Sequence, residues 1–232
     1  MMRRFGWLLG LLLGTAATAG DVEIADYRVL RDDLDGRIDF ERLPPRAEPG
    51  FNLDRPVYSS GAWIGERFVG QQVSSNSTGH DTITGAPDGP WLRIAGGAPR
   101  QNLSVASHRG FGSNALFPLG PAGFPALEAR GEGAVAILFD TDQPATGFRV
   151  HTDYAAPLGT GPAAQGSVEV TLLARDGQRL GHFSHHPGTG ITELGYRLQG
   201  AGPGIAGMLI LNTDPGGIAI DDILFAKPRP LG

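Results

Sequence analysis

The chain contains no cysteine, and only one of its 232 residues is lysine. Without cysteine, neither a disulfide framework nor a lipid-linked thiol is available, so stability must come from an ordinary hydrophobic core. Hydrophobic residues make up 41% of the sequence, which is enough to form such a core at this length. The formal net charge of −5 argues against nucleic acid or an anionic membrane surface as the main partner.

Long hydrophobic runs are also missing. The longest apolar stretch, residues 5–13, is roughly half of the ~20 residues that a membrane-spanning helix needs. It follows Arg3 and Arg4 and precedes the small residues Ala17-Thr18-Ala19, a pattern typical of a cleavable signal peptide. We therefore expect a signal peptide over residues 1–19, a single domain over residues 20–232, and a periplasmic or secreted protein. Cleavage would remove Arg3 and Arg4 and change the formal charge from −5 to −7.

Helical periodicity is scarce in the remaining sequence. Short alternating or apolar runs, bounded by Gly, Pro, Asp or Asn, recur instead and indicate β-strands. Such spacing predicts an all-β fold, a two-sheet antiparallel β-sandwich of the jelly-roll type. Long polar or glycine-rich connections are expected at residues 74–81 and 107–123, where binding sites often lie. The expected strands are residues 37–41, 67–73, 91–95, 102–106, 134–140, 147–153, 167–174, 179–184, 193–198, 207–212 and 217–225.

The closing segment, residues 217–225, places two carboxylates in a strand that is apolar on both faces. Asp221 and Asp222 point to opposite faces, so at least one of them is expected to be buried. A buried carboxylate needs a cation or several hydrogen-bond donors. Calcium is the natural cation outside the cytoplasm because it prefers oxygen ligands. The alternative is a sheet rim at which one carboxylate is solvated and the other pairs with an arginine.

Asp39-Phe40-Glu41 and Ile220-Asp221-Asp222-Ile223 resemble the first and last strands of jelly-roll carbohydrate-binding modules. They are also similar to β-sandwich domains of PEP-CTERM-type sorted proteins, which are exported bacterial proteins, although this chain ends without a hydrophobic sorting tail. The resemblance implies a structural calcium between the first and last strands, held by Glu41 and Asp222, with Asp39 and Asp221 as second choices. It is a likeness of fold, and a fold does not fix a function.

Two further polar patterns offer weaker sites. Asp140 and Asp142 have a spacing that could ligate calcium, but aspartates in this position are more often turn residues. His182, His185 and His186 crowd together, and a zinc or copper site would need two or three of them to converge. Because adjacent strand residues point to opposite sides, a solvated polar rim is the favoured interpretation of these histidines.

Aromatic residues are the main candidates for ligand binding. Exposed aromatic faces stack on the apolar faces of sugars, while polar groups nearby bind the hydroxyls. Trp63 and Tyr154 lie beside small residues in expected loops and are the predicted binding residues. Trp91 opens an alternating run and is expected in the core.

Signatures of enzymes are mostly absent, including the nucleophile elbow, the P-loop, the zincin helix and the dinucleotide fingerprint. We therefore predict an exported, noncatalytic protein that binds an extracellular or periplasmic glycan and holds a structural calcium. One alternative is a structural or matrix protein of the envelope that mediates protein contacts. The other is a glycan-active hydrolase or lyase, which would require paired carboxylates or a His–carboxylate site in a cleft.

Overall fold

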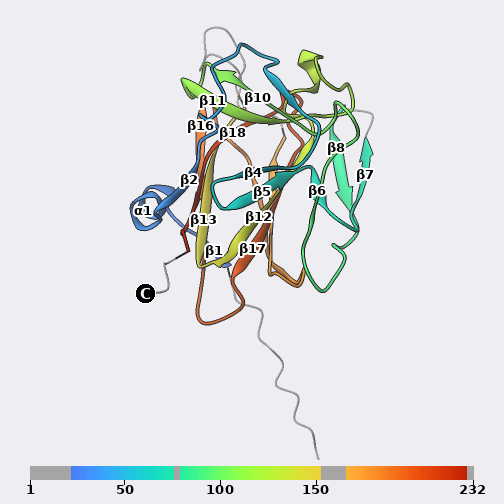
Figure 1. Cartoon of the computed structure of the whole chain (residues 1–232). Helices are drawn as coiled ribbons and strands as arrows, with labels where there is room; N and C mark the ends of the chain where they lie inside the picture. Colours follow the sequence, from blue (N-terminus) through green and yellow to red (C-terminus); the bar gives the residue numbers. More distant parts are fainter. Residues whose placement is uncertain (1–21, 76–78, 153–165, 229–232) are drawn as a thin grey trace, which may run out of the picture.

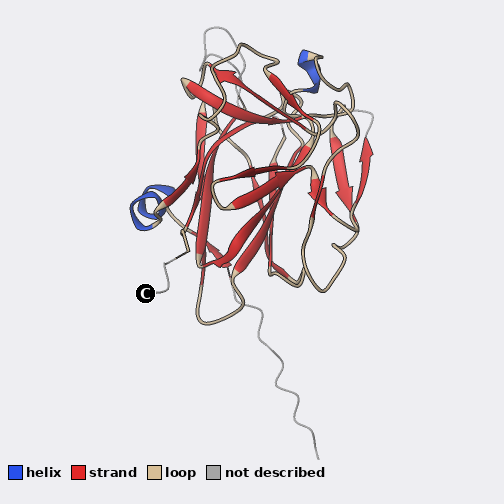
Figure 2. Ribbon diagram, in the orientation of Figure 1, coloured by secondary structure: helices blue, strands red, loops and turns tan. Residues whose placement is uncertain are grey.

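The computed structural model describes residues 22–75, 79–152 and 166–228, and its regular structure is almost entirely β (Figure 2). Most strands belong to two sheets in which every recorded pairing is antiparallel. The predicted two-sheet antiparallel β-sandwich is therefore confirmed. None of the described helices is long and apolar enough to span a membrane.

The eight-stranded sheet, which we call sheet A, has the order β1-β16-β13-β18-β11-β10-β3, and β2 also pairs with β18 (Figure 1). The pairing of β2 with β18 joins an early strand to the last one, as the resemblance implied, although β2 ends at Ile38 and not at the expected Glu41. The strands of sheet A are β1 (Val22–Ile24), β2 (Gly36–Ile38), β3 (Phe51–Leu53), β10 (Leu103–His108), β11 (Ser113–Pro118), β13 (Ala145–His151), β16 (Ile191–Leu198) and β18 (Ala219–Phe225).

The six-stranded sheet, sheet B, has the order β15-β14-β17-β12-β5-β4. From β12 to β18 the chain passes repeatedly between the two sheets, as in a jelly roll. The strands of sheet B are β4 (Val57–Ser59), β5 (Ala62–Gly65), β12 (Ala134–Gln143), β14 (Val168–Leu173), β15 (Arg179–His185) and β17 (Ile205–Asn212).

The main core lies between the sheets and is formed by inward residues of both, such as Ile64, Phe139, Phe148 and Ile220. Alternation explains this arrangement, because residues two apart on a strand face the same side. Smaller apolar clusters cover the outer faces. On sheet A, the helix α1 (Tyr27–Asp33) packs Tyr27 and Leu30 against Ala145 and Leu224. Figure 1 shows α1 on the left, beside β2 and β13.

The outer face of sheet B is covered at its centre by two short two-stranded sheets. They are β6 (Arg67–Phe68) with β9 (Ile94–Ala95) and β7 (Gln72–Ser75) with β8 (Asp81–Thr84). Phe68 and Leu92 pack there on Ala136 and Leu209 of the sheet. Ile94 of β9 also covers Gly65 of β5, but Tyr58 on β4 and Trp63 on β5 stay exposed. A short 3-10 helix, η1 (Leu127–Ala129), completes the regular elements.

Several expected elements differ from those found. Residues 67–73 form two strands instead of one, because the chain turns at Val69-Gly70-Gln71, where Gly70 has a positive φ of 96°. Residues 107–123, expected as a connection, contain all of β11, a central strand of sheet A. The strand expected at residues 91–95 begins only at Ile94, and Trp91 is 65% exposed, so its predicted core position is wrong.

Candidate functional site

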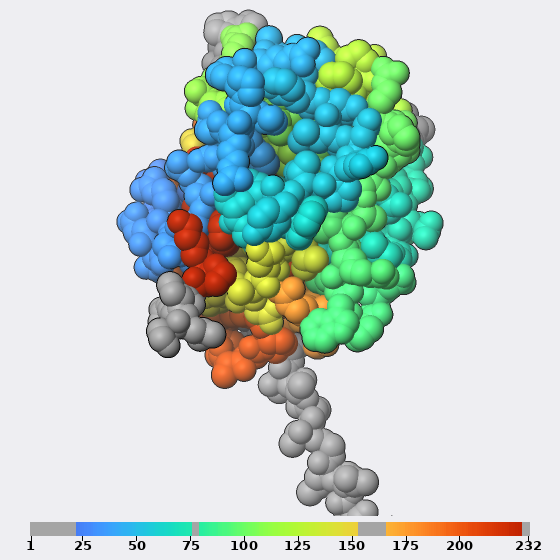
Figure 3. Space-filling view, viewed as in Figure 1, coloured from blue at the N-terminus to red at the C-terminus, as the bar shows by residue number. Residues whose placement is uncertain are grey.

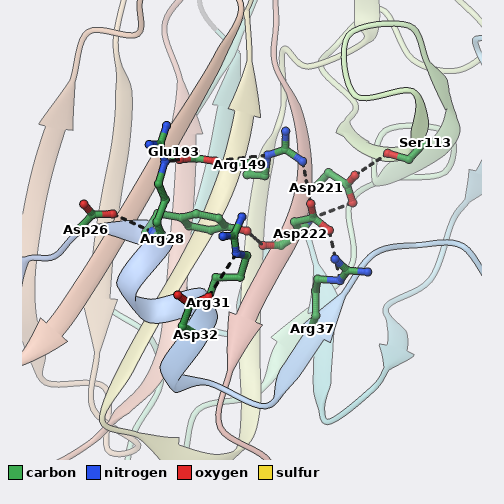
Figure 4. A network of polar contacts seen from close by, with 11 residues as sticks. Asp26, Arg28, Arg31, Asp32, Arg37, Ser113, Arg149, Glu193, Asp221 and Asp222 are labelled. Atoms are coloured by element: carbon green, nitrogen blue, oxygen red, sulfur yellow. Dashed lines mark hydrogen bonds and ion pairs between the residues drawn. The ribbon is translucent and has the colours of Figure 1, made fainter.

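Asp222, a predicted calcium ligand, lies at a bulge of β18. The register with β13 shifts there, and Asp222 has a positive φ of 52°, a conformation that Asp tolerates better than most residues. Its carboxylate lies between two arginines, as Figure 4 shows: Arg149 Nη1 is 2.8 Å from Oδ2, and Arg37 Nε is 3.4 Å from Oδ1. Its backbone oxygen accepts a hydrogen bond from the Tyr27 hydroxyl at 2.9 Å.

Asp221, the neighbouring carboxylate, is buried on the outer face of sheet A. It accepts hydrogen bonds from Ser113 Oγ and from the backbone N–H of Asp222, both at 2.8 Å (Figure 4). Burial raises the pKa of Asp221 to about 7, and the nearby Asp222 charge adds to this rise. The expectation that at least one closing-strand carboxylate is buried is therefore correct.

The early acidic residues have other partners. Asp39 lies 3.5 Å from Arg37, and its side chain accepts a hydrogen bond from the backbone N–H of Glu41. Glu41 in turn accepts the backbone N–H of Asn114 at 2.7 Å. Asn114 follows Ser113 in β11. This strand therefore donates hydrogen bonds to both carboxylates, to Glu41 from a backbone N–H and to Asp221 from a side chain.

Each of these four carboxylates has partners within the protein. The two oxygens of Asp222 face guanidinium groups, which supply the positive charge that a divalent ion would provide. No group of three or more His, Cys, Asp or Glu residues suited to a metal occurs in the described part of the chain. The alternative of a carboxylate paired with arginine describes Asp222 well, and calcium at Asp39, Glu41, Asp221 and Asp222 stays an untested prediction.

The histidines named in the sequence do not converge. His182 is on the outer face of sheet B, 3.2 Å from Glu169, whereas His185 is hydrogen-bonded to the Tyr196 hydroxyl at 2.7 Å. A different pair, His108 and His151, is buried on sheet A with ring centroids 4.7 Å apart. Burial lowers the pKa of His108 to about 4, so this imidazole is neutral at pH 7.

The most open candidate for ligand binding is the pair Tyr58 and Trp63. They are direct cross-strand neighbours on β4 and β5, and Trp63 faces Leu138 of β12 on its other side. Their ring centroids are 5.5 Å apart, and 51% of Tyr58 and 45% of Trp63 is exposed. The Tyr58 hydroxyl donates a hydrogen bond to Asp140 at 2.7 Å, and this bond raises the pKa of Tyr58. The ring is thus held in place while its faces stay accessible.

A pocket of about 510 Å³ adjoins this pair, lined by Trp63 and Leu138 and by Arg55, Pro56, Leu92, Arg93 and Ile94. Figure 3 shows this side of the molecule, with the cyan residues of β4 and β5 above the yellow residues of β12. A second pocket of about 210 Å³ is lined by Tyr58 itself, together with Phe40, Leu43, Leu53, Val57 and Arg42. We call Tyr58, Trp63 and the first pocket the aromatic surface.

The two predicted binding residues have different outcomes. Trp63 is exposed, but it lies on a strand and not in a loop. Tyr154 lies outside the described residues. Tyr58 was not predicted, although the sequence contained a signal: Val57-Tyr-Ser59 and Ala62-Trp-Ile64 flank Ser60-Gly61, a turn that places Tyr58 opposite Trp63.

No protein-family model matches the chain, and no curated protein matches it. Among solved structures, one variant of CBM29-2, a family 29 carbohydrate-binding module, is similar over 60% of this chain and 88% of its own, with 12% identity and a TM-score of 0.30. Another variant of that module covers 62% of this chain and 98% of its own, with the same identity and score.

The enzymatically active domain of tailspike protein 4 from bacteriophage CBA120 is similar over 53% of this chain and 17% of its own, with 12% identity and a TM-score of 0.32. Similarity at this level supports neither a ligand nor an activity. The β-sandwich itself rests on the strand pairing described above, and the likeness to sorted exported proteins stays a prediction.

Proposed function

We propose that this protein is an exported, noncatalytic β-sandwich that binds a glycan on the aromatic surface. The supporting observation is the exposed pair Tyr58 and Trp63 beside an open pocket. Monomeric proteins seldom expose large rings side by side without a function. Aromatic rings stack on the apolar faces of sugars, and rings held by paired strands lose little conformational freedom on binding.

Binding is favoured over hydrolysis by the chemistry of the pocket. The pocket lining contains no carboxylate among the described residues, and nearby Asp140 already accepts a hydrogen bond from the Tyr58 hydroxyl. Hydrolysis of a glycosidic bond commonly requires two carboxylates that flank it. The proposal needs no calcium at Asp222, because Arg37 and Arg149 compensate that charge.

The test is a glycan array followed by calorimetry on the mature protein and two tryptophan variants. We expect Trp63→Ala to weaken binding at least about tenfold, a loss of about 1.4 kcal/mol. Trp91→Ala is the matched control, because Trp91 is exposed but does not line the pocket. Equal affinity of the wild type and Trp63→Ala, with both proteins folded, would remove the aromatic surface as the site.

Turnover of any bound oligosaccharide, followed by chromatography of the products, would replace binding by the hydrolase or lyase alternative. Failure to bind any glycan, together with self-association or capture of an envelope protein, would favour the structural alternative. Export is tested separately by N-terminal sequencing of the protein recovered from the periplasm or medium, where we expect the chain to begin after Ala19.

A further inference from the structure

The aromatic surface carries positive charge that the protein itself does not neutralise. Arg55 and Arg93 both line the first pocket, and both are exposed. Arg55 forms no ion pair or side-chain hydrogen bond with the described residues, and Arg93 has only Asp88, at the outer limit of 4.0 Å. Arginines elsewhere form closer pairs, as Arg175 does with Asp142 at 2.6 Å.

The nearby carboxylates have other partners. Asp54, the neighbour of Arg55 in sequence, accepts hydrogen bonds from the Asn52 side chain at 2.9 Å and from the backbone N–H of Arg100 at 2.6 Å. Asp140 accepts a hydrogen bond from the hydroxyl of Tyr58. The charge of Arg55 is therefore available to a ligand, although the chain as a whole is acidic.

The second pocket, which Tyr58 lines, also contains an arginine. Arg42 lines it and forms no ion pair or side-chain hydrogen bond with the described residues. Tyr58 lines this second pocket, and its cross-strand neighbour Trp63 lines the first, so each ring of the pair adjoins a pocket with an arginine in its lining. A chain of sugars that crosses Tyr58 and Trp63 would place its substituents near arginines of both pockets.

An arginine with a free planar guanidinium binds carboxylate oxygens in pairs, through two parallel hydrogen bonds. Neutral sugars offer hydroxyls, which give weaker bonds to arginine because they carry no charge. Combining an aromatic face for the ring with a guanidinium for its substituent therefore selects a sugar that bears a carboxylate.

We propose that the glycan bound by the aromatic surface is acidic, and that Arg55 and Arg93 bind the carboxylate of a uronic acid stacked on Trp63. Arg42 would take a second carboxylate further along the chain. This inference rests on the proposed function, and it adds the chemical class of the ligand.

The experiment measures calorimetric affinities of the mature protein for acidic and neutral hexasaccharides. The acidic probes are oligogalacturonate, oligomannuronate and oligoguluronate, and each is paired with its methyl ester, which keeps the sugar and removes the charge. The neutral probes are cello-oligosaccharide and manno-oligosaccharide, and a sulfated oligosaccharide tests the other common anion. We expect one acidic probe to bind at least about tenfold more tightly than its ester, and to weaken in high salt.

Two variants assign the effect to residues. Arg55→Gln combined with Arg93→Gln is expected to remove the preference for the acid over its ester. Arg179→Gln is the matched control for charge, because Arg179 is an exposed arginine on β15, at the opposite edge of sheet B from β4. We expect this control to bind like the wild type.

The outcomes separate this inference from the proposed function. Binding of neutral probes or esters as tightly as acids, unchanged in the double variant, would overturn the acidic ligand and leave glycan binding intact. Binding of the sulfated probe alone would overturn the carboxylate assignment. Binding of none of the probes, nor of any glycan on the array, would overturn both proposals.

Discussion

The replacement Asp222→Asn tests whether arginines fasten the closing strand β18 to its neighbours. Asparagine has nearly the same shape and tolerates the positive φ at this position, so the bulge is retained. The backbone oxygen that accepts the Tyr27 hydroxyl is also kept. The variant therefore removes mainly the negative charge between Arg37 and Arg149.

The expected loss follows from the two contacts. The Arg149 contact is 2.8 Å long between side chains that are 26% and 15% exposed, and a charged hydrogen bond of this kind contributes about 1.5–3 kcal/mol. The Arg37 contact is longer, at 3.4 Å, and Arg37 is 54% exposed, so it contributes less than about 1 kcal/mol. We expect the free energy of unfolding to fall by about 2 kcal/mol.

Urea denaturation followed by tryptophan fluorescence measures this loss, with Asp33→Asn as the matched control. Asp33 pairs with Arg197, but these side chains are 51% and 37% exposed, so the control should lose less than about 1 kcal/mol. Adding calcium or excess EDTA should leave the wild type unchanged. The reasoning would fail if EDTA destabilised the wild type by as much as the substitution does and left Asp222→Asn unaffected. That result would mean that a bound metal ion compensates the charge of Asp222.

The second half of the fold was largely predictable from the sequence. Strands β12, β14, β15 and β17 alternate regularly or form apolar runs bounded by turn residues, and their observed limits lie within a few residues of the expected ones. The missed elements are short. The helix α1 has only seven residues, too few to show a sustained helical period, although Asp26 caps it by accepting the N–H of Arg28.

The site was less predictable because it depends on residues far apart in the chain. Asp222 and Arg149 are separated by 73 positions, and no local pattern shows that a bulge brings them together. The same limit applies to Tyr58, whose bond to Asp140 joins residues 82 positions apart. The residue types indicated which side chains could take part in binding. Only the pairing between distant strands determined whether the charge of such a side chain is compensated by an arginine or is left for a ligand.

Two further predictions concern positions 131 and 132, which precede β12. Gly131→Ala should lower the free energy of unfolding by at least about 3 kcal/mol, because φ is +77° and the new Cβ would lie 1.9 Å from the backbone nitrogen of Ile218. The control Gly112→Ala, where φ is +71° and the space around the new Cβ is open, should lower it by only about 1 kcal/mol in the same urea assay. Glu132 is buried, and burial together with the charge of Asp214 raises its pKa to about 7 from an ordinary value of 4.5. The folded protein thus holds this proton more tightly than the unfolded chain, so the stabilisation is complete below about pH 4.5 and is lost as the pH rises through about 7. Glu132→Gln should therefore flatten the pH dependence and unfold at higher urea than the wild type at about pH 8 but not at about pH 4; equal shifts at both pH values would show that ionisation of Glu132 is not the cause.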